Sequence, residues 1–389
     1  MLRLGVIGYG ARIRGVLREI GVFGRSKLVA IADPRAEEIK AEEGEKLAGV
    51  ALFTDADEML DTVPLDGVLI GTRCSLHAPM AVKVARRNIP LFLEKPVAID
   101  AEGIEMLCNA WTESTAPVVV SFPLRVSLTI QRVKEIVDSG AIGSIEHVQA
   151  VNNVPYGDVY FYHWYRDHRE TGGLWLQKAT HDFDYISFLL NSRPKWVAAM
   201  KSRRVYGGSM PAGLRCVDCD RQDECIESPQ NLFYRRHARP TPFDDRRMCL
   251  FGEEIENEDN ASALLEYESG VQVSYVHNFF ARNGAAARGA RLIGYKGTID
   301  FDWYRGDIVV YYHHTPRTER ITFDTAKTGH FGGDRVLARN FLDVIEGKDQ
   351  SLSPLRAGIE SALACLAARD SSENRRFVEV KYPEAIPSV

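Results

Sequence analysis

The sequence lacks the segments that carry proteins into or across membranes. None of its apolar runs approaches the roughly 18 residues that a membrane-spanning helix requires. The first residues, MLRLGVIGYG, are typical of a strand that runs into a turn, and they contain neither the basic region nor the cleavage site of a secretory signal peptide. We therefore expect a cytoplasmic protein with no membrane partner.

Neither sign of charge dominates the chain. Lys and Arg number 48 and Asp and Glu 53, which gives a net charge of −5, and the basic residues form no stripe. Because nucleic acids are bound by clustered Lys and Arg, we expect no nucleic-acid partner. The 45% hydrophobic and 26% charged content is that of a soluble globular protein. A chain of 389 residues is long for one core, which predicts two domains.

Cysteine is scarce. Of the seven in the chain, Cys74, Cys108 and Cys365 are isolated, which argues against a disulfide framework. The other four lie in a charged, proline-containing segment at about 206–258, and they are Cys216, Cys219, Cys225 and Cys249. A segment with so few apolar residues needs a cross-link to hold it folded, and a tetrahedral zinc ion bound by cysteines is the simplest one in a reducing compartment. Only the first pair has the Cys-x2-Cys metal spacing, so structural zinc stands beside unlinked thiols or disulfides as alternatives.

The first third of the chain alternates apolar runs with helix-like segments. The apolar runs are residues 2–8, 27–33, 51–53, 66–72, 90–94 and 116–122. Continuous apolar strands joined through helices predict an α/β fold with a parallel, doubly wound sheet. Ligands bind to such sheets at the carboxyl ends of the strands, so the residues after each run are the candidates for function.

The first run ends in the glycine turn GYGARI. Its glycines let the backbone approach a pyrophosphate, and the helix that follows offers free N–H groups and a positive dipole end. The usual third glycine is replaced by Ile13, and we expect Gly15 to supply the close packing in its place. The candidate cofactor contacts in this turn are Gly8, Gly10, Ala11, Arg12 and Ile13.

The second run ends in Asp33. A carboxylate at this place accepts hydrogen bonds from an adenosine ribose and repels a 2′-phosphate, which favours NAD over NADP. Arg12 and Arg35 weaken that preference, because either guanidinium can neutralise a phosphate.

The fifth run leads directly into Glu94, Lys95 and Pro96. Pro96 restricts Lys95 to an extended backbone and admits a cis bond in a tight turn. A charged pair on the same rim as the glycine turn points into the ligand crevice, and an ordinary salt bridge at a strand end is the plainer alternative. Thr72, after the fourth run, and His77 join Glu94 and Lys95 as candidate cofactor contacts.

The motifs GVIGYG, IADP, GTRCSLHAPMAVKVARRNIPLFLEKPVA and GGLWLQKATHDFD resemble those of the glucose–fructose oxidoreductase/inositol dehydrogenase/rhizopine-catabolism (Gfo/Idh/MocA) family. The resemblance implies a Rossmann NAD-binding domain at 1–122. It also implies an α+β substrate domain at 123–389, with a large, mostly antiparallel sheet. The cysteine-containing insert at about 206–258 falls within this domain, and the family's general pattern does not explain it. That sheet often forms an oligomer interface in the family, which implies a homo-oligomer, either a dimer or a tetramer. Family members mostly oxidise or reduce hydroxyl groups of sugars and cyclitols.

The resemblance also assigns catalytic roles. Lys95 would touch the nicotinamide ribose and the substrate hydroxyl, and His181 would be the acid/base. Such chemistry needs a base of near-neutral pKa and a cation that stabilises the developing charge. The candidate substrate residues are Arg125, His163, Trp164, Gln177, Lys178 and Asp184.

Two further features of the second domain bear on this site. Gln177, His181 and Asp184 recur at helical spacing, which predicts one stripe of a single helix. The segment HFGGD, residues 330–334, begins another helix and resembles a loop near the site in some relatives.

One departure puts the usual mechanism in doubt. Many relatives carry an aspartate one turn before the histidine, where this sequence has Gln177 followed by Lys178. An amide cannot raise the basicity of His181 as a carboxylate does, and a nearby lysine lowers it. Either Lys178 shares the acid/base work, or the substrate is an acidic sugar, or the reaction is not a simple oxidation.

The sequence therefore favours an NAD-dependent dehydrogenase that acts on a small sugar, sugar acid or cyclitol. The first alternative is an NAD-retaining glycosidase or lyase that acts by transient oxidation. The second alternative is a non-catalytic sensor that binds NAD and a sugar, against which the presence of both Lys95 and His181 argues.

Overall fold

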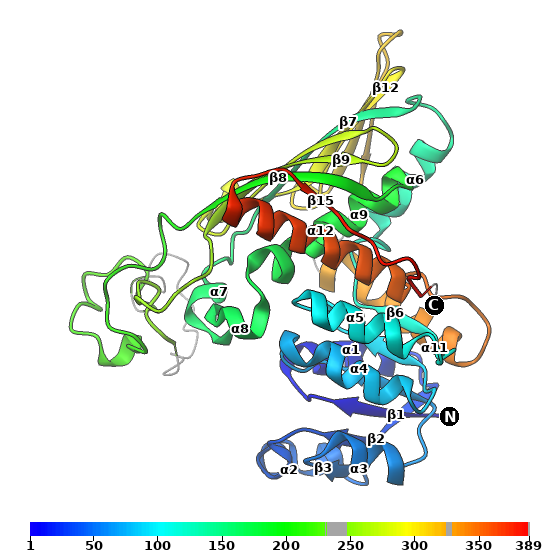
Figure 1. The fold of residues 1–389 in the computed structure, drawn as a ribbon, viewed down its shortest axis with the longest axis vertical. Helices are drawn as coiled ribbons and strands as arrows, with labels where there is room; N and C mark the ends of the chain where they lie inside the picture. Colours follow the sequence, from blue (N-terminus) through cyan, green and yellow to red (C-terminus); the bar gives the residue numbers. More distant parts are fainter. Residues whose placement is uncertain (230, 232–246, 324–328, 388–389) are drawn as a thin grey trace.

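The structure is a computed structural model that describes residues 1–229, 231, 247–323 and 329–387. It is built on a six-stranded and a nine-stranded sheet, and the long helix α12 (Leu355–Asn374) runs between them (Figure 1). The α/β class and the two-sheet architecture expected from the sequence are confirmed. Within the described ranges, no helix has both the length and the apolar content needed to cross a membrane.

The first sheet is parallel throughout, with the strand order β3-β2-β1-β4-β5-β6. Its strands are β1 (Leu2–Ile7), β2 (Ser26–Ala32), β3 (Ala51–Phe53), β4 (Gly67–Ile70), β5 (Leu91–Leu93) and β6 (Val118–Val120). The helices that connect them are α1 (Ala11–Gly21), α2 (Ala36–Glu43), α3 (Ala56–Thr62), α4 (His77–Ala85) and α5 (Ala101–Ala110). This is the Rossmann order, whose ligand crevice opens at the switch between β1 and β4.

Burial on both faces explains why these strands read as continuous apolar runs. In β5, Leu91 and Leu93 pack into one core and Phe92 into the other. Helix α11 (Gly333–Ile345) covers the second face beside α1, and the rings of Phe92 and Phe341 are 5.6 Å apart. A helix from far beyond residue 122 thus completes a layer of the first sheet.

The second sheet has the order β14-β13-β12-β11-β7-β10-β9-β8-β15, and only the pair β7–β10 is parallel. Its strands are β7 (Ile145–Asn153), β8 (Pro194–Ser202), β9 (Asn260–Tyr267), β10 (Gln272–Asn278), β11 (Ala287–Gly294), β12 (Gly297–Asp302), β13 (Asp307–Tyr312), β14 (Thr318–Thr322) and β15 (Val378–Glu379). This is the large, mostly antiparallel sheet that the resemblance implies.

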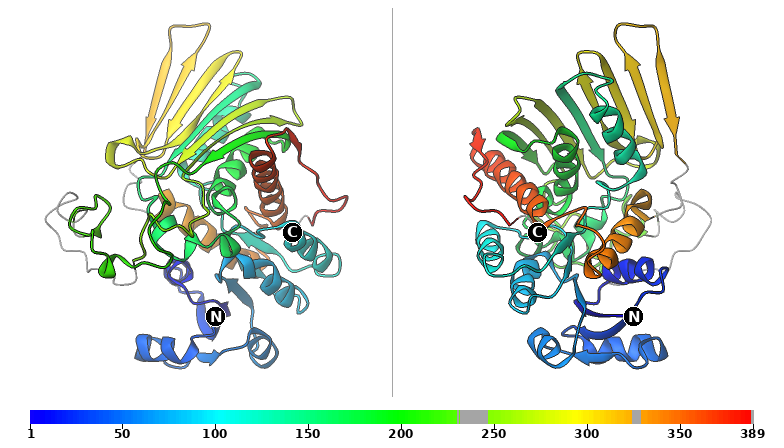
Figure 2. Two further views of the ribbon diagram at one scale, coloured as in Figure 1. Left: turned by 60° about the vertical axis from the view of Figure 1, so that its left-hand side comes forward. Right: turned by 90° about the vertical axis from the view of Figure 1, so that its right-hand side faces the viewer.

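Helices lie on only one face of this sheet in the described chain. Figures 1 and 2 show α6 (Leu128–Asp138), α9 (Thr180–Leu190) and α12 on that side. Along β9, buried and exposed residues alternate, and Leu264 is 60% exposed on the opposite face. In β8, Met200 is 73% exposed in the same way. The bare face therefore presents apolar side chains to solvent.

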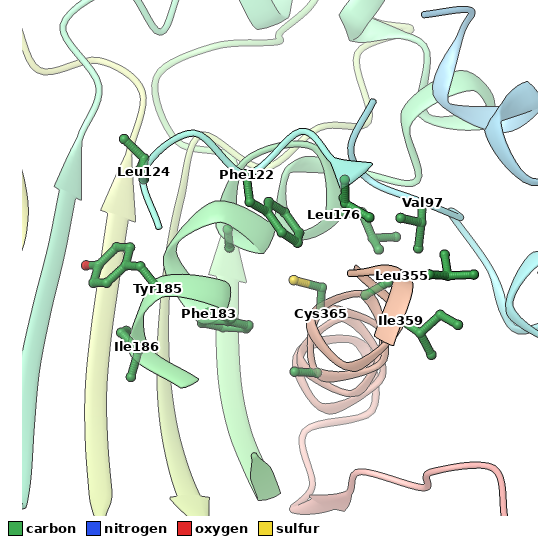
Figure 3. Close-up of a cluster of buried hydrophobic side chains, with 14 of the residues drawn as sticks. Val97, Phe122, Leu124, Leu176, Phe183, Tyr185, Ile186, Leu355, Ile359 and Cys365 are labelled. Atoms are coloured by element: carbon green, nitrogen blue, oxygen red, sulfur yellow. The ribbon is translucent and has the colours of Figure 1, made fainter. Parts of the chain in front are cut away.

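One hydrophobic core joins the two sheets (Figure 3). Val97 and Phe122 from the first domain, Leu176 and Phe183 from the second, and Leu355 of α12 belong to this cluster. The helix approaches closely, because a Cβ on its Gly358 would lie 2.5 Å from a Val97 methyl group. This shared core holds the end of β6 against the helices that carry the site.

Two short helices, α7 (Val159–Tyr162) and α8 (His168–Thr171), follow β7, and the insert projects beside them (Figure 1). In its described part, the insert is held by bridges between Met210 and Gly252 and between Arg215 and Met248. A small core that includes Tyr206 and Leu250 packs it against α7.

Candidate active site

The glycine turn after β1 leaves an open cradle at the start of α1. Gly8 has a φ of +83°, and a Cβ there would lie 2.8 Å from the backbone nitrogen of Thr72, so this position requires glycine. At Gly10 a Cβ would meet nothing closer than 3.8 Å. No side chain caps α1 and its first turn holds no acidic residue, so its first N–H groups stay available to an anion. A pyrophosphate suits this arrangement.

The structure shows what compensates for Ile13 in the glycine pattern. A Cβ on Gly71 would lie 1.9 Å from Cγ1 of Ile13, so the Ile13 side chain occupies the space beside the end of β4. A Cβ on Gly15 would have no neighbour closer than 3.9 Å, and the expectation that Gly15 supplies the close packing is wrong. A helix and a strand can pack closely when either one has a glycine at the contact, and here the glycine is Gly71, which follows β4.

Asp33 is fixed against the glycine turn at the end of β2. It is 6% exposed and accepts hydrogen bonds from the backbone N–H groups of Tyr9 and Arg35, both at 2.9 Å. A carboxylate offers about four acceptor positions, so Asp33 keeps capacity for ribose hydroxyls. The Arg35 guanidinium lies 3.4 Å from Asp33 and its side chain is 54% exposed. Arg35 is thus placed where it could meet a 2′-phosphate.

Arg12 and Glu94 are cofactor candidates in the sequence, and the structure pairs them with each other at 2.7 Å. The Arg12 guanidinium also binds Asp334 at 2.7 Å and donates to the Ser121 hydroxyl at 2.8 Å. Glu94 is 5% exposed, and a carboxylate buried to this extent requires a charged partner. The expectation that Arg12 can neutralise a phosphate is therefore wrong, because three partners already occupy its guanidinium.

Lys95 follows β5 and reaches across the crevice to the second domain. The Lys95–Pro96 peptide bond is cis, as the sequence admits. The ammonium donates to the main-chain oxygen of Gln177 at 2.6 Å and to its Oε1 at 2.8 Å. Among the described residues no carboxylate lies within ion-pair distance, so the plain Glu94–Lys95 salt bridge is excluded. Burial lowers the pKa of Lys95 to about 8.

Thr72 and His77 lie on the same rim with different surroundings. His77 is 2% exposed, and its Nδ1 is 2.7 Å from the carbonyl oxygen of Pro96, so it supports the Lys95–Pro96 turn from beneath. Thr72 is half-buried beside Gly8, and its hydroxyl donates to the carbonyl of Arg73 at 3.1 Å. Of the two, Thr72 is the one placed at the cradle itself.

The helix of His181 begins with a wide turn. Residues Trp175–Ala179, η4, form one turn of π-helix before α9, a feature that is frequent at functional sites. Gln177 lies in this wide turn and contacts Lys95, whereas His181 and Asp184 lie in α9. The predicted single α-helix through all three residues is therefore wrong, because a π-helical turn precedes α9.

His181 is 6% exposed, and its Nδ1 has no hydrogen-bond partner within the described structure. Its ring lies 5.9 Å from that of Phe122 and 6.2 Å from that of His330. Burial first, then the charges of Lys95 and Arg288, lower the pKa of His181 well below its ordinary value. The imidazole is therefore neutral, and the Lys95 ammonium acts on it electrostatically.

Lys178 lies beneath Tyr156, which follows β7. Its ammonium donates to the Tyr156 hydroxyl at 2.7 Å and also lies 5.7 Å from the centre of the Tyr160 ring. Lys178 is 4% exposed, whereas Tyr156 is 44% exposed. The structure thus brings Lys178 to the site, as expected, together with a tyrosine at its open side.

A buried charge network anchors α9 to the second sheet. Asp182 accepts hydrogen bonds from Asn152 at 2.6 Å, Tyr275 at 2.8 Å and Arg288 at 2.9 Å. Asp182 is fully buried and Arg288 is 3% exposed. Strands β7, β10 and β11 each supply one of these partners, so the network fixes the height of α9 above the sheet.

Arg125 and Asp184, two candidate substrate residues, bind each other. Arg125 Nη2 and Nε lie 2.5 and 3.1 Å from Asp184 Oδ1, and Asp184 is 2% exposed. Burial raises the pKa of Asp184, although Arg125 acts against it. The pair ties the end of β6 to α9, because a buried carboxylate needs a cation. We therefore assign it to structure, which corrects its expected role in substrate binding.

The aromatic segment after α7 reaches the cofactor rim. The Trp164 ring lies 3.9 Å beneath the guanidinium of Arg73, which follows Thr72, and packs against Tyr165 at 4.0 Å. His163 is exposed, with its ring 6.1 Å from Tyr165. This segment bridges the two domains at the rim of the crevice, where Trp164 is closer to the cofactor side than the sequence indicates.

Tyr156 and Arg288 of the site were not indicated by the sequence, and His330 was indicated only as part of the segment 330–334. His330 lies 2.8 Å from Asp334, which binds Arg12, so the loop before α11 links the glycine turn to His181. The signal for His330 was the HFGGD segment. Tyr156 follows a strand, as do the residues singled out in the first domain, but nothing local distinguishes it. Arg288 lies within a strand and carries no such signal.

The four cysteines of the insert, Cys216, Cys219, Cys225 and Cys249, are free thiols. Across the described ranges, no group of three or more Cys, His, Asp or Glu side chains is arranged to hold a metal ion. Burial raises the pKa of Cys216 to about 11. The structure does not support the zinc alternative.

Two family descriptions match the chain. The NAD-binding Rossmann fold of an oxidoreductase family matches residues 2–122, and the GFO/IDH/MocA C-terminal domain matches residues 130–300. The protein therefore belongs to the Gfo/Idh/MocA family of oxidoreductases, and its first domain is the NAD-binding domain of that family.

Named relatives span most of the chain. YteT of Bacillus subtilis (strain 168), to which an oxidoreductase function has been assigned provisionally, is 27% identical over 86% of both chains. Inositol 2-dehydrogenase of Rhizobium meliloti (strain 1021) is 27% identical over 72% of this chain and 83% of its own.

Solved structures confirm the fold across nearly the whole chain. Levoglucosan dehydrogenase in complex with NADH and levoglucosan has a TM-score of 0.78 at 17% identity, covering 98% of this chain and 100% of its own. The WlbA dehydrogenase of Bordetella pertussis in complex with NADH and UDP-GlcNAcA has a TM-score of 0.71 at 20% identity, covering 98% and 99%.

Proposed function

We propose that this protein is an NAD-dependent dehydrogenase that transfers a hydride between nicotinamide and a CH–OH group of a sugar, a sugar acid or a cyclitol. One observation carries the proposal. Lys95, a half-buried lysine with no carboxylate within ion-pair distance in the described part of the chain, leaves the rim of a Rossmann sheet and acts on a neutral imidazole, His181, from the other domain. A cation that stabilises the developing charge, with a neutral group beside it that can hydrogen-bond the substrate oxygen, suits alcohol oxidation next to a dinucleotide cradle.

The residues of the first domain fit NAD. The N–H groups at the start of α1 and the open side of Gly10 would hold the pyrophosphate, and Asp33 would accept from the adenosine ribose. When bound, NAD supplies the hydride acceptor at its nicotinamide ring. The commitment of Arg12 to Glu94 and Asp334 supports NAD over NADP, because it removes one of the two guanidinium groups that could neutralise a 2′-phosphate and leaves Arg35 as the other.

Two observations support a polyhydroxylated substrate. The relatives include enzymes named for inositol and for levoglucosan, both of which carry several hydroxyl groups. On this chain, Tyr156, Trp164 and Tyr304 offer aromatic faces and hydroxyl groups near Lys178 and the rim. Lys95, which has no carboxylate within ion-pair distance among the residues that the structure describes, also suits a sugar acid such as the one in the complex of WlbA.

The bare face of the second sheet supports a homo-oligomer, dimer or tetramer. Its exposed apolar side chains, Met200, Leu264 and Val276, lie on the three neighbouring strands β8, β9 and β10. A contiguous apolar surface of this kind is typical of a subunit interface. Light scattering of the purified protein should give a multiple of the 43.6 kDa chain mass. The substitution Leu264→Lys should shift the mass towards the monomer.

The seven free thiols agree with a cytoplasmic protein.

The function is tested by measuring NADH formation with a panel of sugars, uronates and inositols, with NADP as the competing cofactor. We expect NADH with at least one compound and a preference for NAD. Release of the aryl group from an aryl glycoside without net NADH would instead establish the NAD-retaining glycosidase. Binding of NAD and a sugar without turnover of either would establish the sensor.

A further inference from the structure

The proton that leaves the substrate hydroxyl needs an acceptor, and His181 is poorly equipped for that task. Its pKa lies well below the ordinary value because of burial and of the cations around it, Lys95, Arg288 and Lys178 among them. Gln177 stands where a carboxylate would raise the basicity of the imidazole, and its side chain is bound to Lys95 instead. A base whose conjugate acid is destabilised to this extent is weak.

We propose that Tyr156, held and activated by Lys178, accepts the proton from the substrate hydroxyl, in place of a histidine–carboxylate pair. This inference rests on the proposed dehydrogenase function and names a further catalytic residue within it. Lys178 acts through Tyr156 and is a positioning residue.

The geometry of the pair supports this assignment. The Lys178 ammonium donates to the Tyr156 oxygen at 2.7 Å and has no carboxylate within ion-pair distance among the described residues. Lys178 is buried beneath the tyrosine, so the 44% exposed Tyr156 forms the outer member of the pair. Lys178 is near enough to act electrostatically on Lys95, His181 and His330, which places the pair at the same reacting centre.

The groups that face Tyr156 come from four neighbouring elements and the turn after β12. They are Lys178 of η4, Arg288 of β11, Asp182 of α9, Tyr160 of α7 and Tyr304. Partial burial of the phenol acts to raise the pKa of Tyr156, but Lys178 and Arg288 outweigh it and lower this pKa below the ordinary value of about 10. Asp182 acts in the opposite direction but is already bound to Arg288.

The step balances in atoms and electrons. In the direction of oxidation, the substrate O–H bond breaks and its proton passes to the Tyr156 phenolate. The adjacent C–H bond breaks and its hydride passes to nicotinamide, which leaves a C=O group on the substrate. Lys178 stabilises the phenolate before the transfer, and the neutral phenol afterwards returns its proton to solvent through its exposed side.

The experiment compares Tyr156→Phe with Tyr295→Phe, a matched change at a 73% exposed tyrosine between β11 and β12. General acid–base groups contribute about 100-fold or more to rate, so Tyr156→Phe should lower kcat by about that factor. KM and the binding of NADH, followed by its fluorescence, should change little. Tyr295→Phe should leave kcat unchanged.

A second measurement requires no cofactor. Tyrosinate absorbance of the protein alone, titrated with pH, should contain one component that ionises below the ordinary range. That component should disappear in Tyr156→Phe and persist in Tyr295→Phe. Lys178→Met should move it to higher pH, and Lys178→Arg should largely restore it, because the cation is retained.

The outcomes separate the two proposals. An active wild type whose kcat survives Tyr156→Phe, or a titration without the early component, overturns the role of Tyr156 and leaves the dehydrogenase function standing. A wild type that forms NADH with no compound of the panel overturns the dehydrogenase function and the catalytic use of the pair with it, even where the early tyrosinate component is present.

Discussion

Around the glycine turn, the groups offered to a ligand are backbone N–H groups and side chains that directly follow strands of the first sheet. Around His181, by contrast, they are side chains, some of them buried, that come from a π-helical turn, from strand β11 and from loops after β7 and before α11. On the cofactor side, a residue contacts the ligand because it directly follows a strand, so its place in the sequence predicts its role. On the substrate side, a residue's contacts depend on which charged groups pair with one another in the folded protein. Lys95 is the residue at which the two sides meet.

The largest effect is expected where the two sides join. Lys95→Met removes the cation that faces the substrate oxygen, and the loss of one such group typically lowers kcat by about 100- to 1000-fold. Steady-state kinetics on the best substrate of the panel would measure it. Lys27→Met, at an exposed lysine of β2 in the same domain, is the control and should behave as wild type. Retention of kcat in Lys95→Met would remove Lys95 from the chemistry.

Breaking the Arg125–Asp184 pair on the substrate side should lower the stability of the protein more than it weakens substrate binding. Arg125→Met leaves the Asp184 carboxylate buried without a cation, which typically costs about 3–5 kcal/mol of unfolding free energy. Urea unfolding followed by circular dichroism would measure the loss, and the further change Asp184→Asn should recover part of it. A stable Arg125→Met protein with a raised KM would instead return both residues to the substrate.

On the cofactor side, Gly10 in the glycine turn and Gly15 in the helix that follows it should respond in opposite ways. Gly10→Val adds a side chain where no protein atom interferes, so it should weaken NAD binding by about tenfold or more without loss of melting temperature. Gly15→Ala, inside α1 and free of contacts, should raise stability by about 0.5–1 kcal/mol and leave binding unchanged. Calorimetric titration and thermal melts would test both. Equal effects of the two changes on NAD affinity would contradict the open cradle at Gly10.

The smallest change expected is a shift in pH dependence. Lys95 loses its proton as pH rises through its pKa of about 8, so kcat/KM should fall along that limb. Gln177→Glu places a carboxylate beside the ammonium, favours its charged form, and should move this limb upward by about one pH unit or more. Gln272→Glu, at an exposed position at the start of β10, should leave the profile unchanged. An unmoved limb in Gln177→Glu would mean that it does not belong to Lys95.

The chain by itself was sufficient for the parallel sheet, the glycine turn and the delivery of Lys95 to the rim. These features depend on residues close in sequence: apolar runs such as Leu91–Leu93 are buried on both faces, and Gly8 permits a turn that other residues cannot adopt. The wrong expectation at Gly15 shows the limit, because the glycine that admits Ile13 is Gly71, on a different element.

Only the tertiary structure decided which charges pair. Arg12 finds its partners at Glu94 and Asp334, Arg125 finds Asp184, and Lys178 is left with Tyr156 as its hydrogen-bond partner. The physical reason is that a charge enters a protein interior only together with a partner of suitable geometry, and that partner can lie anywhere in the chain. Sequence spacing carries no information about such a choice, which is made when the two sheets close over their shared core.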